Sequence, residues 1–144
     1  MSREKMIEQK LKAIEDLRKE INLLSRLELK RLYKIKDTAP NFIDEHIVFE
    51  TWGYIVAFNK LTIRFCVVAS NNSHYTHSHR WFDLRAVEHT NVVNFYYDKL
   101  YRSWSGPVLT PAKKDDLPLL VGLEYKFPEL ELILKGKKKV LLDA

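Results

Sequence analysis

The stretch that decides the fold is MSREKMIEQKLKAIEDLRKEINLLSRLELKRLYKIK, residues 1–36. It contains neither glycine nor proline, and its apolar residues recur with a helical period. Written as heptads, isoleucine fills position a and leucine fills position d, at Ile7, Ile14, Leu17, Ile21 and Leu24. β-Branched residues at a with leucine at d favour a parallel two-stranded coiled coil. We therefore expect a helix through which copies of the chain associate.

A second interpretation keeps this helix within one molecule. Lys10 occupies one d position, and Leu11 widens the apolar stripe beyond a strict seam. A wider stripe is typical of a helix packed on its own domain, and three heptads make a short coiled coil. Both interpretations stay open at this point, and self-association is the one that we favour.

The heptad pattern stops near Ser25, where Ser25-Arg-Leu-Glu28 resembles a capping box at the start of a helix. Either one helix continues to about Lys36, or a second helix begins at Arg26 in a new direction. We favour the break. Pro40 then ends the helical region, because a proline disfavours helical backbone in the residue before it.

The basic charge of the chain lies in this first segment. The 144 residues carry a net charge of +5. Residues 1–36 hold eleven Lys and Arg against six Asp and Glu, whereas residues 37–144 hold thirteen of each kind. Such a surface attracts anions, although a solubilising helix face would look the same. The residues of this candidate basic surface are Arg26, Lys30, Arg31 and Lys34.

A second basic run near the C-terminus consists of Lys135, Lys137, Lys138 and Lys139. We interpret it as the protection of an edge strand, because lysines on an edge discourage pairing with other sheets. Anion binding by this run is the less favoured alternative.

Composition indicates a globular protein of a reducing compartment. The chain has one cysteine, Cys66, so an internal disulfide is excluded. This cysteine falls within an apolar strand pattern, and we expect it to pack rather than react. No apolar run resembles a signal peptide or reaches the length of a bilayer span, so we expect a cytoplasmic protein.

Beyond residue 46 the apolar pattern changes to the period of a strand. Residues 46–50, 54–58 and 61–67 predict an antiparallel meander with a turn at 51–53. In the third of these strands the apolar face is Leu61, Ile63, Phe65 and Val67, with Cys66 on the other face.

The rest of the chain predicts further strands and one helix. Alternation favours strands at 80–87, 119–127 and 130–134, followed by a hairpin at 135–137. Val93, Tyr97, Leu100 and Trp104 share a helical stripe and predict an inserted helix. The expected fold is α+β: a helical oligomerisation segment at 1–36, then a domain at 37–144 of six or seven mainly antiparallel strands with one inserted helix.

A histidine-rich loop could bind a metal. His74, His77 and His79 lie within six residues, with Asp83 and Glu88 nearby. Zinc accepts three such ligands and a water. The usual zinc-hydrolase motifs are absent, so we assign no metal and no cofactor.

Arginine and histidine donors alternate with aromatic rings in the same region and in residues 96–104. Arginine matches phosphate geometry, and an aromatic ring can stack on a base. Packing of the rings in a core is the competing interpretation, and for the stripe with Tyr97 and Trp104 we favour it. The candidate ligand-binding residues are His77, His79, Arg80, Trp81, Arg85 and Arg102.

Enzyme signatures are missing from the sequence. Four glycines form no phosphate-binding loop, and no nucleophile elbow is present. We expect a non-enzymatic, oligomeric protein that binds, and could sequester, an anionic nucleotide or nucleic acid. The first alternative is a protein–protein inhibitor or adaptor acting through the helix or a sheet edge. The second is a small metal-dependent hydrolase that uses the histidines at 74–79.

Overall fold

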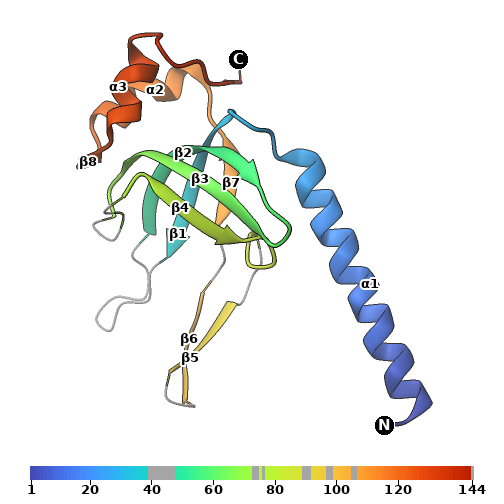
Figure 1. Cartoon of the computed structure of the whole chain (residues 1–144). Helices are drawn as coiled ribbons and strands as arrows, with labels where there is room; N and C mark the ends of the chain where they lie inside the picture. Colours follow the sequence, from blue (N-terminus) through green and yellow to red (C-terminus); the bar gives the residue numbers. More distant parts are fainter. Residues whose placement is uncertain are drawn as a thin grey trace.

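The computed structural model describes residues 1–38, 48–72, 75, 77–88, 92–96, 99–104 and 107–143, with backbone alone at 37, 38, 48, 92–96 and 99–104. An N-terminal helix is followed by a mainly antiparallel sheet and two short helices (Figure 1). The predicted α+β class is therefore confirmed. Within the described residues, none of the helices combines the length and the hydropathy that crossing a bilayer would require.

Helix α1 (Arg3–Arg26) begins with the side chain of Ser2, which accepts a hydrogen bond of 3.2 Å from the amide of Lys5. It ends at Arg26, so the favoured break is confirmed. No new helix starts there, because the Ser25 hydroxyl donates backward to the carbonyl of Asn22 instead of capping a following turn. The predicted second helix was wrong.

The chain continues as strand β1 (Leu32–Thr38), which lies between two other strands. Leu32, Tyr33 and Ile35 are all fully buried. Tyr33 and Ile35 alternate with the more exposed Lys34 and Lys36, but this strand pattern is short and directly follows a long helical period in the sequence. Burial on both faces outweighed the local preference for helix.

The main sheet has the order β4-β3-β2-β1-β7, and β8 pairs with the end of β3. Every pairing in it is antiparallel. A separate two-stranded sheet joins β5 and β6. The strands are β2 (Val48–Phe58), β3 (Thr62–Ser70), β4 (His79–Asp83), β5 (Val92–Tyr96), β6 (Lys99–Trp104), β7 (Val108–Pro111) and β8 (Tyr125–Lys126).

Several predicted elements differ from the structure. The helix predicted over residues 93–104 was wrong, because β5 and β6 form a hairpin there; its valines and aromatics favour strands as well as a helical stripe. The turn predicted at 51–53 lies inside β2, and the strand predicted at 80–87 ends at Asp83.

Strands were also wrongly predicted at 119–127 and 130–134. These residues form α2 (Leu117–Val121), β8, and α3 (Pro128–Leu134), preceded by the single 3-10 turn η1 (Lys114–Asp116). Each short helix has a proline in its first turn, where the missing N–H costs nothing. In helices this short, apolar residues spaced two apart are easily mistaken for a strand.

Both faces of the sheet are buried. We call one the Phe65 face; it gathers Ile63, Phe65 and Val67, as predicted, and packs against Leu23 and Leu27 at the end of α1. The other, the Cys66 face, gathers Trp52, Tyr54, Cys66 and Val68 beneath α2 and α3. Leu120, Leu130 and Ile133 are the buried residues of these helices in this cluster, and Leu117 is partly buried against it.

Two β-bulges adjust the register between β2 and β3. The first lies between Trp52 and Gly53, and the second between Ile55 and Ala57. A side chain at Gly53 would place its Cβ 2.2 Å from the carbonyl oxygen of Cys66. Only glycine therefore permits the strands to approach this closely, and the register between the bulges places Tyr54 opposite Cys66.

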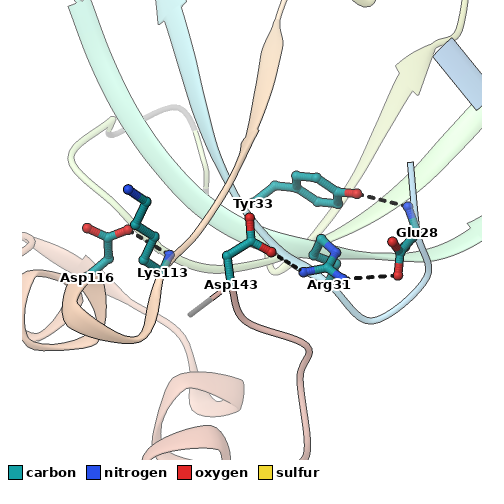
Figure 2. A network of polar contacts seen from close by, with 6 residues as sticks. All are labelled: Glu28, Arg31, Tyr33, Lys113, Asp116 and Asp143. Atoms are coloured by element: carbon teal, nitrogen blue, oxygen red, sulfur yellow. Dashed lines mark hydrogen bonds and ion pairs between the residues drawn. The ribbon is translucent and has the colours of Figure 1, made fainter. Parts of the chain in front are cut away.

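The C-terminal segment is attached to the start of β1. The amide of Leu32 donates to the carbonyl of Leu141 at 2.9 Å, and the amide of Leu141 donates to Lys30 at 2.8 Å. Arg31 donates to Asp143 at 2.5 Å and to Glu28 at 3.2 Å (Figure 2). These contacts hold the chain after α3 against the sheet.

A candidate anion-binding pocket

A row of side chains crosses four strands on the Cys66 face. Leu32 pairs with Tyr54, Tyr54 with Cys66, and Cys66 with His79. Directly opposite residues in antiparallel strands project from the same face, so this row is fixed by the register of the sheet. Its polar members are the hydroxyl of Tyr54, the thiol of Cys66 and the imidazole of His79.

A pocket of about 570 Å³ lies between this row and the segment that follows α3. Pockets of this size accommodate small ligands and cofactors. Among its lining residues are Tyr54, Cys66, His79, Glu129, Lys30 and Lys138. Lys137 and Lys139 line it as well, so that four lysines surround one space.

The end of α3 brings three of these lysines to the pocket. Gly136 adopts a φ of 72°, the left-handed conformation that ends helices, and the amide of Lys137 donates to the carbonyl of Leu132 at 2.9 Å. The ammonium of Lys138 then lies 4.9 Å from the centre of the Tyr54 ring. This cation–π contact holds a positive charge over the row of polar side chains.

The thiol and the phenol are neutral at physiological pH. Burial raises the pKa of the Cys66 thiol, although the neighbouring Tyr54 hydroxyl opposes this by hydrogen bonding to it. Burial also raises the pKa of Tyr54 well above its ordinary range, and the hydrogen bond to Cys66 adds to the increase. The pocket therefore gains no negative charge from either group.

Glu129 contributes a carboxylate to the lining, and its Oε2 atom is buried without a hydrogen-bond partner. A buried acceptor without a donor is costly, and such atoms are often completed by a ligand or water. The pocket thus offers lysine ammonium groups for an anion, whereas this Glu129 oxygen is closed off from the pocket by its own burial.

The candidate ligand-binding residues divide between the two faces of β4. His79 lines the pocket. Trp81, two residues along, projects from the same face of β4; it is 52% exposed and lies 5.5 Å from the guanidinium of Arg64. Arg80 projects from the opposite face and lies over the ring of Tyr75 at 4.9 Å.

Two of the remaining three, His77 and Arg85, do not line the pocket. His77 is exposed just before β4. Arg85 is paired with Asp83 through two hydrogen bonds of 2.9 and 3.1 Å, and this pairing lowers the pKa of the carboxyl. The side chain of Arg102 lies outside the described part of the structure.

Three residues of the candidate basic surface have carboxylate partners. Arg26 pairs with Glu88, and Arg31 pairs with Glu28 and Asp143. Lys34 lies 3.1 Å from Glu50 and 5.4 Å from the centre of the Trp52 ring. Lys30 is the member of this set that lines the pocket.

The two carboxylates proposed as metal ligands are the partners of Arg85 and Arg26. His74 lies outside the described residues. Within the described ranges, no three His, Cys, Asp or Glu residues are arranged to hold a metal ion.

Comparison with known proteins gave no match to a family model, to a curated protein or to a solved structure. The pocket must therefore be interpreted from its own chemistry.

Sequence reasoning missed Tyr54, Glu129 and Lys138 as site residues. Tyr54 and Cys66 were interpreted as packing residues in apolar strands. The lysine run at residues 135–139 was interpreted as the protection of an edge strand. The lysine run was visible in the sequence. Its position over Tyr54 depends on the attachment of the C-terminal segment to β1, which has no local signal.

Proposed function

We propose that this protein binds a small phosphate-bearing ligand of the nucleotide class in the pocket on the Cys66 face, without converting it. The observation that carries the proposal is the position of Lys138 over Tyr54, inside a pocket lined by four lysines and His79. Phosphate is the common biological anion that several ammonium groups can contact together.

One further feature favours a nucleotide over inorganic phosphate. Trp81 projects beside His79 with half its surface exposed, so a base can stack on it while the phosphate contacts the lysines. Stacking on an aromatic ring contributes roughly 1–3 kcal/mol per base.

Binding without turnover agrees with the state of the reactive groups. A raised pKa keeps the Cys66 thiol protonated, and a thiol is a much weaker nucleophile than a thiolate. The raised pKa of Tyr54 keeps its phenol protonated, so the hydroxyl is unsuited to act as a base.

The test is calorimetric titration with ADP and with pyrophosphate as probes. The Lys138→Ala substitution should weaken ADP binding about tenfold or more, because a charge-assisted contact contributes roughly 1.5–3 kcal/mol. Lys114→Ala is the matched control, since this exposed lysine lies in η1 and does not line the pocket. Equal affinities for the two variants, or no heat with either probe, would contradict the proposal.

Salt dependence separates a nucleotide from a nucleic acid. A single ligand with two phosphates should lose affinity gently as salt is raised, whereas a nucleic acid held by many lysines loses it steeply. A steep loss with single-stranded oligonucleotides, combined with no binding of ADP, would replace the nucleotide by a polymer.

A further inference from the structure

The apolar stripe of α1 is left uncovered by the chain that carries it. The residues of the stripe are Met6, Ile7, Leu11, Ile14, Leu17, Ile21 and Leu24, and each is between 39% and 63% exposed. Among the residues of α1, all of which the structure describes, Leu23 alone is buried. The helix projects away from the sheet and touches it near its last turn (Figure 1).

The anchoring side of α1 is opposite to the stripe. Leu23 packs with Leu84 and Val87, and Arg26 pairs with Glu88 in the turn after β4. At about 100° per residue, Leu23 lies roughly 160–180° around the helix from each isoleucine. The interpretation that the helix lies with its stripe on its own sheet was therefore wrong for the described chain.

We propose that the stripe of α1 docks the same stripe of a second copy of this chain, as a short parallel coiled coil. Isoleucine at a and leucine at d interlock best with an identical partner in parallel. Complete pairing would bury roughly 700 Å² from each copy, close to the ~800 Å² per partner of a standard stable interface. Pairing through the stripe leaves the contact between Leu23 and the sheet undisturbed in each copy, because Leu23 faces away from the seam.

The flanking positions are compatible with this partner. Met6, Leu11 and Ala13 are uncharged residues beside the seam, so they add apolar contact without repulsion. Lys10 meets its counterpart across the pair, and its long stem lets the ammonium reach solvent. This one polar d residue restricts the register while weakening the association.

The first test measures mass by light scattering over a range of protein concentrations. The wild type should approach twice the chain mass of 17.1 kDa, and Ile14→Asp/Ile21→Asp should stay at 17.1 kDa. Gln9→Asp is the control for an added aspartate, because it places a negative charge on the side of the helix away from the stripe, and it should behave as the wild type. A wild type that stays at 17.1 kDa at the highest concentration, or a double variant that retains the double mass, would overturn the proposal.

The second test reads orientation in a chain with an intact stripe, so it does not depend on a disruptive substitution. Arg3 lies at a d position, and Arg3→Cys should form an intermolecular disulfide on mild oxidation. Cys66 is 1% exposed and should not compete. In an antiparallel pair the two cysteines would be about 36 Å apart, the length of the helix, so no link could form. Gln9→Cys should link poorly in either case. A dimer in which Arg3→Cys fails to cross-link would overturn the parallel pairing.

Discussion

Replacing Gly53 with alanine tests the close approach of strands β2 and β3. The added Cβ would lie 2.2 Å from the carbonyl oxygen of Cys66 and 2.3 Å from Cε1 of the Phe65 ring. Both neighbours belong to β3, and Phe65 is fully buried. Neither atom is the free end of a flexible chain, so the strands themselves must separate.

The expected loss of stability follows from how far the two strands must separate. A carbon and an oxygen in contact need about 3.2 Å, so β2 and β3 would separate by about 1 Å. Overpacking alone costs roughly 1–3 kcal/mol, and stretching two adjacent ladder hydrogen bonds adds about 1 kcal/mol each. The lower entropy of the unfolded alanine variant returns only about 0.4–1 kcal/mol. We expect a net loss of about 3 kcal/mol.

The assay is urea unfolding followed by tryptophan fluorescence, with thermal melting as a second measurement. A loss of about 3 kcal/mol should lower the midpoint by roughly 10 °C for a chain of this length. Gly122→Ala is the matched control, because its Cβ would meet nothing closer than the carbonyl oxygen of Leu119 at 3.5 Å. The free energy of unfolding of this control variant should lie within about 1 kcal/mol of that of the wild type. If Gly53→Ala were as stable as Gly122→Ala, the close approach at the first bulge would be refuted.

Four further experiments should give measurable changes. Burial and the raised pKa of the Cys66 thiol should make the native protein react with a disulfide reagent much more slowly than the urea-unfolded protein. The same shift means that the unfolded thiol ionises first, so the free energy of unfolding should fall as pH rises above about 8.5, and fall less steeply in Cys66→Ala. Tyr33→Phe should cost about 1 kcal/mol in urea unfolding, because the amide of Glu28 loses its 2.8 Å bond to the Tyr33 hydroxyl; an unchanged midpoint would mean that water replaces the bond (Figure 2). Gly136→Ala should cost about 1 kcal/mol through its φ of 72°, and a gain in thermal stability would contradict that backbone conformation.

Patterns of neighbouring residues predicted the elements whose conformation depends mainly on their own sequence. Helix α1 could be predicted because its heptad pattern and its lack of glycine and proline are local features of the sequence. The alternation in β3 was visible because one of its faces is wholly apolar. Over residues 119–134 the same rule failed, since leucines two apart suit a short helix that begins with proline as well as a strand.

The pocket was out of reach for a different reason. His79 was singled out from its neighbours in sequence, whereas Tyr54, Cys66 and Lys138 meet it only through strand register and the course of the C-terminal segment. Both depend on contacts between distant parts of the chain. The charges of Arg26 and Arg31 were likewise visible, but their partners Glu88 and Asp143 were not.

The two bulges make the lengths of neighbouring strands interdependent. Val68 is the additional residue of β3 at the first bulge, Val56 is the additional residue of β2 at the second, and three paired positions lie between them. Each offset undoes the other, so the strands leave this region aligned as they entered it. A deletion in one strand alone would turn the intervening side chains to the wrong side, whereas paired deletions would preserve the alignment beyond. Any insertion or loss in one of these strands must therefore be matched by a change in its neighbour.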